Sequence, residues 1–160
     1  MSHISFLGIP VEGEITPARR ATQRPLEELQ PLLRALLDDD AVTEFGWRQY
    51  SPYFNDGDTC DFSVEGFWVR TTGDGPRVHP KDLEVGKYAE PHPSLGGPRR
   101  VSGRRGPYQG RDEGRYQRAY ALAVALEEGG FDNVLLDAFG DHAEVTVRRE
   151  GIQVRYYEHE

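Results

Sequence analysis

The chain has 160 residues, 37% of them hydrophobic, and a formal net charge of −8 at pH 7. This length fits one domain, residues 1–160, that can fold without disulfides or metal. The single cysteine, Cys60, cannot form an internal disulfide, and no apolar run approaches the ~20 residues of a membrane helix. The apolar stretch 4–11 contains a proline and lacks a basic start, so we do not expect it to be a secretory signal. We therefore expect a cytoplasmic protein with no membrane partner.

The charges are unevenly distributed along the chain. Residues 1–98 carry nine Lys and Arg against 16 Asp and Glu, and residues 121–160 carry three against nine. Residues 99–120 instead hold seven arginines against two acids, a local excess of five positive charges. An acidic chain with one basic patch is not typical of a protein that coats nucleic acid broadly, so any contact with polyanions is expected at the patch.

The first half of the chain predicts a short strand, a helix and a strand pair. Residues 3–9 are compatible with a short strand, and prolines mark a connection up to residue 24. Leucines at 26, 29, 33, 36 and 37 share one face of a helix expected over residues 25–40, although Pro31 interrupts it. Residues 47–71 predict two strands joined by a tight turn at Asn55-Asp56-Gly57-Asp58.

The second half predicts a long loop, a helix and three strands. Residues 72–111 are rich in Gly and Pro and poor in large apolar side chains, which is typical of a long flexible loop. The clearest helix covers residues 112–128, and three strands are expected at 133–139, 143–149 and 152–157. The sequence therefore predicts an α+β fold: an antiparallel sheet of about five strands packed by two helices, with a long Gly/Pro/Arg-rich loop.

The segment 47–62 has the pattern W-x-Q-Y-x-P-Y-F-N-D-G-[DE]-x-C-x-F. It resembles an uncharacterised family of small bacteriophage and bacterial proteins that share this pattern, and residues 139–147 look like a second block of the same family. Together the two blocks cover about a quarter of the chain. The resemblance implies relatedness and a phage or prophage origin, and it assigns no catalytic residue.

Around the predicted turn, Asp56 and Asp58 are candidate metal ligands, with Asp61 nearby. The spacing of acids and glycine does not match a calcium loop, and a plain hairpin turn is the favoured interpretation. Cys60 alternates with apolar Phe62 and is expected to be a buried small side chain. The histidines form no metal-binding pair, and we expect no cofactor. Asp141-His142 is a minor candidate for acid–base chemistry.

The arginine-rich loop is the best candidate for an interaction site. Arginine beside aromatic side chains can hold phosphates and stack on bases. The candidate binding residues are Arg99, Arg100, Arg104, Arg105, Tyr108 and Arg111. The alternative is that these arginines only balance the acidic remainder of the chain.

Two hypotheses about function follow, and we name no catalytic residue under either. The favoured one is a small non-enzymatic binding or adaptor protein that acts through an exposed face or the arginine-rich loop. Its partner is expected to be another protein, with nucleic acid as a further possibility through the loop. The alternative is a metal- or carboxylate-dependent enzyme with a site near the turn at residues 55–58.

Overall fold

The computed structural model describes residues 4–13, 21–52 and 61–158. Within these residues it has three α-helices, eight strands and one 3-10 turn. They are β1 (Ile4–Phe6), β2 (Ile9–Val11), α1 (Leu26–Leu37), β3 (Val42–Tyr50), β4 (Ser63–Thr71), η1 (Pro80–Leu83), β5 (Gly97–Val101), β6 (Arg104–Gln109), α2 (Glu113–Glu127), α3 (Asp132–Phe139), β7 (Ala143–Arg148) and β8 (Gly151–Tyr156). The α+β class with antiparallel sheets is confirmed. None of these helices has the length and apolar character needed to cross a membrane.

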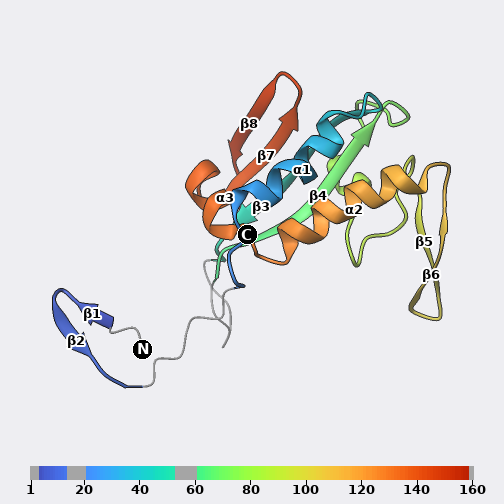
Figure 1. Ribbon diagram of the computed structural model, residues 1–160. Coiled ribbons are helices and arrows are strands. Elements are labelled where there is room, and N and C mark those ends of the chain that lie inside the picture. Colours follow the sequence, from blue (N-terminus) through green and yellow to red (C-terminus); the bar gives the residue numbers. More distant parts are fainter. Residues whose placement is uncertain (1–3, 14–20, 53–60, 159–160) are drawn as a thin grey trace.

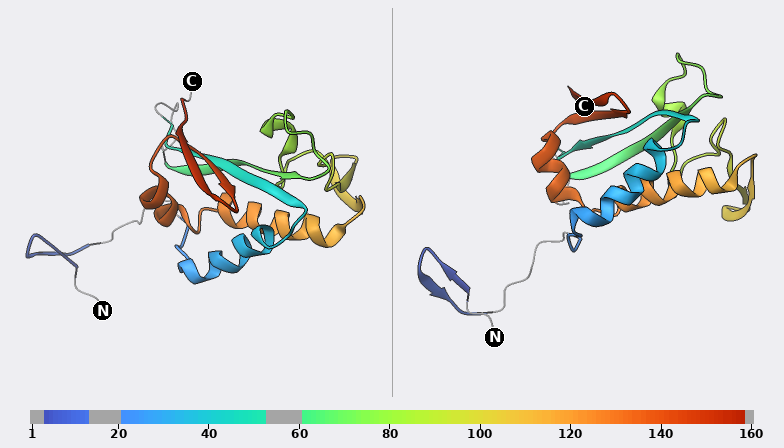
Figure 2. Two further views of the ribbon diagram at one scale, coloured as in Figure 1. Left: turned by 90° about the horizontal axis from the view of Figure 1, so that it is seen from above. Right: turned by 45° about the horizontal axis from the view of Figure 1, so that its top comes forward.

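The main sheet has the strand order β4-β3-β7-β8, and the helices lie on one of its faces (Figures 1 and 2). The central strand β3 alternates so that Phe45, Trp47 and Gln49 are fully buried on the helix side. Leu36 of α1 and Leu126 of α2 belong to the same core and are also fully buried. The fold is therefore two layers, a sheet and a helical layer, with the core between them.

The side chain of Asp39 joins the C-terminal end of α1 to the N-terminal part of α2. Its carboxylate accepts a hydrogen bond from Arg115 Nε at 2.7 Å and lies 3.4 Å from Arg118. Burial alone would raise the pKa of the Asp39 carboxyl, but hydrogen bonds from Arg115 and from the amide of Ala41 hold it below its usual value. Two arginines of the basic segment 99–120 are thus used within the fold.

The predicted strand at 133–139 is wrong, because these residues form the helix α3. Leu135 is buried and Phe139 is half-buried four residues later, which is helical spacing. Asp132 lies in the first turn, where a carboxylate suits the helix dipole. An apolar run of this length fits either a strand or a helix by pattern, so packing decides between them.

The other predicted elements are largely confirmed, with shifted ends. The predicted helices 25–40 and 112–128 correspond to α1 and α2, and the strands 143–149 and 152–157 correspond to β7 and β8. The short strand expected at 3–9 is the hairpin β1–β2. The first strand of the predicted pair begins five residues earlier, at Val42, and the turn at 55–58 lies outside the described residues.

The segment 72–111 contains more structure than the sequence suggests. It includes η1 and the hairpin β5–β6, and it buries Leu83, Val85, His92 and Leu95. Leu83 and Val85 pack where the segment crosses the edge of β4: the amide of Val85 donates to the carbonyl of Phe67 at 3.0 Å. A few buried side chains at wide spacing are enough to dock this segment, although they form no periodic pattern.

A buried glutamine connects the sheet to α3. The Nε2 atom of Gln49 donates to the carbonyl of Leu135 at 2.9 Å and to that of Gly140 at 2.7 Å. Its Oε1 atom accepts from the indole of Trp47 at 2.9 Å. Gly140 follows the helix with a φ of 84°, in the left-handed region that favours glycine. One side chain therefore bonds a carbonyl within α3, that of Leu135, and the carbonyl of Gly140, the residue that ends the helix.

Gln49→Leu should lower the free energy of unfolding by about 2–4 kcal/mol, because it leaves an indole N–H and two carbonyls without their partner in the core. Chemical denaturation followed by tryptophan fluorescence measures the change. Gln117→Leu, at an exposed position of α2, is the matched control and should change stability little. Equal effects of the two substitutions would contradict the role assigned to Gln49.

Candidate functional site

The arginine-rich sequence folds into the hairpin β5–β6, which lies outside the main sheet at the end of α2 (Figure 1). Val101 pairs with Arg104 across a two-residue turn. The turn residues Ser102 and Gly103 have φ values of 52° and 76°. Positive φ at both positions gives the turn whose twist matches that of the two strands, so the hairpin has a defined geometry.

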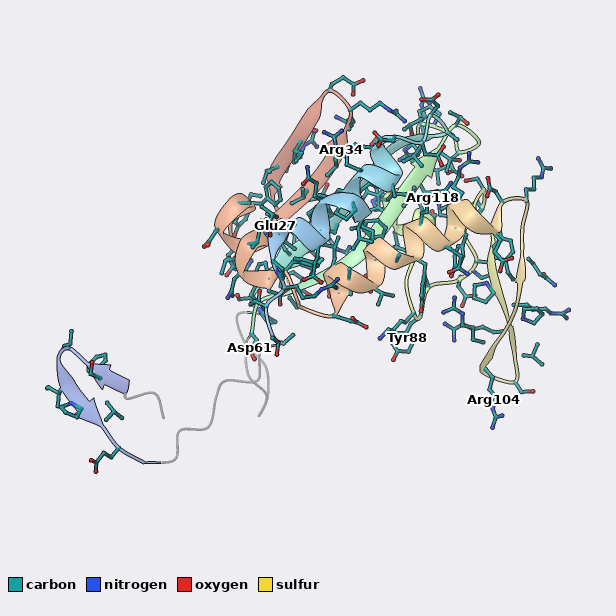
Figure 3. The ribbon with its side chains drawn as sticks, in the orientation of Figure 1. Glu27, Arg34, Asp61, Tyr88, Arg104 and Arg118 are labelled. Atoms are coloured by element: carbon teal, nitrogen blue, oxygen red, sulfur yellow. The ribbon has the colours of Figure 1, made fainter. Side chains whose placement is uncertain are left out.

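Four of the candidate arginines lie on this hairpin, and the fifth, Arg111, follows it in the chain. All five are exposed, and Figure 3 shows Arg104 at the far end of the hairpin pointing away from the protein. They are Arg99, Arg100, Arg104, Arg105 and Arg111. Among the described residues, no acidic side chain forms an ion pair with any of them. The hairpin therefore presents positive charge that the fold does not neutralise by direct contact.

Tyr108 anchors the root of the hairpin. Its hydroxyl donates to the carbonyl of Leu95 at 2.6 Å, and its ring lies 5.5 Å from the ring of Tyr116 on α2. Tyr116 in turn stacks on Tyr120 at 5.9 Å. A Cβ atom at Gly110 would collide with the Tyr108 hydroxyl, so the chain must be glycine there. The packed ring of Tyr108 fixes the hairpin on α2 and contributes little surface for stacking on a base.

Two of the five arginines are held in place by neighbouring groups. The guanidinium of Arg105 lies 4.3 Å above the ring of Tyr120, in cation–π geometry. Arg100 donates to the carbonyl of Lys87 at 2.9 Å. Both contacts leave further N–H groups of each guanidinium for a ligand, since arginine has five. Partial ordering of this kind lowers the entropy lost when an anion is bound.

A hollow of about 670 Å³ lies at the root of the hairpin. The turn at 71–73, the loop 91–97 and the first residues of α2 form its walls. Arg111 and Arg115 both line it, and Arg115 is held by Asp39. Gly97 and Gln109, which pair at the two ends of the hairpin, also line the hollow, so it belongs to the same surface.

His92, Ser94 and Asp74 lie beside this hollow, and their bonds indicate a structural role. The buried His92 ring accepts from the amides of Ser94 (3.1 Å) and Leu95 (3.0 Å) at Nδ1. Its Nε2 lies 2.6 Å from the carbonyl of Val69, which can only accept, so Nε2 carries the proton. Burial lowers the pKa of His92. The neutral ring thus ties loop 91–97 to β4.

The hydroxyl of Ser94 donates to the carboxylate of Asp74 at 2.8 Å and lies 3.4 Å from the ring of His92. A serine nucleophile needs a histidine with a free nitrogen aimed at its hydroxyl. Here that nitrogen accepts two backbone amides instead. The cluster therefore has the residue types of a catalytic triad but not its hydrogen-bond pattern.

The two sequence blocks at residues 47–62 and 139–147 contact each other. Trp47 and Gln49 of the first block meet the second block at Phe139, whose ring lies 6.1 Å from the indole, and at the Gly140 carbonyl. Asp141 also accepts from the amide of Ser51 at 2.7 Å. These residues hold β3, α3 and β7 together, so their spacing in the sequence reflects packing in the core.

Next to this contact, Asp141 accepts from the amide of His142 at 2.8 Å, and the His142 ring stacks on Tyr50 at 6.4 Å. Burial raises the pKa of Tyr50 to about 12, with a further contribution from a hydrogen bond to Glu65. Burial alone would raise the pKa of the Asp141 carboxyl, but the hydrogen bonds from Ser51 outweigh this effect and lower that pKa. The pair caps the start of β7.

The predicted metal ligands Asp56 and Asp58 and the thiol of Cys60 lie outside the described residues. Within the described ranges, no three His, Cys, Asp or Glu side chains are grouped so that they could hold a metal ion. The metal-site hypothesis at the turn thus stays a prediction from the sequence.

Comparison of the chain with models of known protein families, with curated proteins and with solved structures found no match. The resemblance noted for residues 47–62 and 139–147 therefore stays a sequence-based prediction.

One carboxylate near the C-terminal end of α2 has unusual electrostatics. Burial raises the pKa of Glu127 to about 7, and the nearby carboxylates of Glu84 and Glu65 add to the rise. The amide of Phe67 donates a hydrogen bond to Glu127 at 3.4 Å, and this bond partly offsets the rise in pKa. Because the pKa is higher in the folded state, ionisation of Glu127 costs stability: its contribution is most favourable below pH 4.5 and is lost as the pH rises through 7.

Glu127→Gln should therefore raise the melting temperature relative to the unchanged protein at pH 8, and the difference should vanish near pH 4. A glutamine oxygen can still accept from the Phe67 amide. Thermal denaturation across this pH range measures the effect, with Glu90→Gln, at an exposed position, as control. A melting-temperature difference that does not change between pH 4 and pH 8 would contradict the assignment.

Proposed function

We propose that the protein is a non-enzymatic binding protein that holds nucleic acid through the hairpin β5–β6. The observation that carries the proposal is a set of five exposed arginines without acidic partners among the described residues, four of them on one ordered ribbon and the fifth, Arg111, two residues beyond it. A two-stranded ribbon fits the major groove of duplex DNA, which is about 12 Å wide. Guanidinium groups form paired hydrogen bonds with phosphate oxygens.

The distribution of charge supports a localised contact. The chain as a whole carries a net charge of −8, so most of its surface repels a polyanion. Arg115 and Arg118 are bound to Asp39 within the fold, whereas no carboxylate in the described part of the chain pairs with the hairpin arginines. Binding should then be modest in affinity, confined to the hairpin and sensitive to salt.

Binding of a fluorescent DNA duplex, measured by anisotropy at several salt concentrations, tests the proposal. If each of the five arginines meets a phosphate, the logarithm of the association constant should fall with log[salt] with a slope of about −4.5. The double variant Arg99→Gln, Arg104→Gln should weaken binding and reduce the magnitude of that slope by about 2. These two arginines make no hydrogen bond that holds the hairpin, so the fold should be kept.

The double variant Arg34→Gln, Arg77→Gln is the matched control, since it removes the same charge from exposed positions outside the hairpin. It should leave the slope unchanged. Equal effects of the two double variants, or no binding of DNA at low salt, would overturn the proposal. Polyglutamate that competes as well as DNA would indicate an acidic protein as the partner instead.

A further inference from the structure

Tyr88 presents its ring to solvent beside the hairpin β5–β6. It is 89% exposed, more than any other large apolar or aromatic side chain in the described residues. Within the same residues its side chain makes no hydrogen bond and no contact with another ring. A single exposed ring is common on protein surfaces, so its surroundings decide whether it has a role in binding.

The turn that carries Tyr88 is anchored to the fold on both sides. The amide of Ala89 donates to the carbonyl of Gly86 at 3.4 Å, which closes the turn. Before the turn, the amide of Val85 bonds to β4, and after it His92 and Gly96 bond to each other through two backbone hydrogen bonds of 3.0 and 2.9 Å. The ring therefore starts from an ordered backbone, which lowers the entropy lost when a ligand stacks on it.

Arg100 of β5 lies directly next to this turn. Its guanidinium donates to the carbonyl of Lys87 at 2.9 Å, and that carbonyl belongs to the peptide bond between Lys87 and Tyr88. The guanidinium is thus within about 6 Å of the Tyr88 backbone, and Figure 3 shows Tyr88 below α2, where the hairpin also lies. Successive phosphates of one strand follow at intervals of a few ångströms along its axis. A phosphate held at Arg100 therefore places a neighbouring base within reach of the ring.

We propose that Tyr88 stacks on an unpaired base of the nucleic acid that the arginines of β5–β6 hold. This inference rests on the proposed function and names its substrate class, a single strand or a strand with an unpaired base. Bases within a duplex are covered on both faces by their neighbours, whereas an unpaired base offers its face to an aromatic side chain. Tyr108, the aromatic residue within the basic segment, is packed against Tyr116 on α2 and leaves this role to Tyr88.

The charges on the other side of Tyr88 limit the contact to a single base. Tyr88 lines a hollow of about 340 Å³ together with Asp82, Glu84 and Glu90. Against these three carboxylates the hollow has one basic side chain, Lys81. A second phosphate is repelled there, so the bound strand extends from Tyr88 toward the hairpin and not into the hollow.

Binding of a single strand of about 12 nucleotides, compared with a duplex of the same length by fluorescence anisotropy, tests the inference. Tyr88→Ala should weaken binding of the single strand at least fivefold, because a base stacked on one aromatic ring strengthens binding by about fivefold to 150-fold. It should change binding of the duplex less than twofold. Tyr88→Phe keeps the ring and should keep the affinity for the single strand.

Two further features separate stacking from loss of charge or of the fold. The slope of log K against log[salt] should be the same for Tyr88→Ala and the unchanged chain, because stacking releases no counterions. Phe6→Ala is the matched control: it removes a ring that is 68% exposed on β1, far from the hairpin (Figure 1). It should leave both affinities unchanged, and circular dichroism should show the same fold for all variants.

Photo-cross-linking locates the contact without any substitution. A single strand that carries 5-iodouracil should cross-link to the tryptic peptide between Lys87 and Arg99, in which Tyr88 is the only tyrosine. A cross-link to the peptide that contains Tyr108 instead would overturn the inference. So would equal losses for single strand and duplex in Tyr88→Ala, or no loss for either. In these cases the salt-dependent binding through the arginines would still stand, whereas failure of both nucleic acids to bind would overturn the proposed function as well.

Discussion

The amide of Gln49 is the contact on which the arrangement of sheet and helices depends. It lies fully buried in the middle of the sheet and makes hydrogen bonds to Trp47, Leu135 and Gly140. A buried polar group of this kind is stable only when all its bonds are made, so α3 can dock in one position. That position sets where the chain enters β7, and through β7 it sets the place of β8 at the edge.

The helical layer explains both the stability of the sheet and its open edge. The apolar residues of β4, β3 and β7 are buried beneath α1, α2 and α3, while those of β8 stay exposed. The apolar face of a sheet is fully buried only by a packed layer of the same width. Here the helical layer extends over β4, β3 and β7 and ends before β8. Ile152 and Val154 of β8 are therefore left exposed.

Within the described residues, the fold separates the arginines of segment 99–120 into a set that pairs with carboxylates and a set that does not. Asp39 binds Arg115 and Arg118, which fastens α1 to α2. The arginines of β5–β6 are carried away from the acidic surface on a ribbon rooted by Tyr108. Separating them in this way keeps them available to an anionic ligand, which is the basis of the proposed function.

The sequence by itself determined the elements whose pattern is local: α2, β7 and β8 follow from periods of 3.6 and two residues, and the hairpin arginines are visible as a cluster in the chain. The tertiary structure alone decided that residues 132–139 are a helix, that Arg115 pairs with Asp39 some 76 residues away, and that Ile152 and Val154 stay exposed. Each of these depends on which surfaces meet. A side chain's burial and partner are set by contacts between distant segments, and local periodicity carries no record of them.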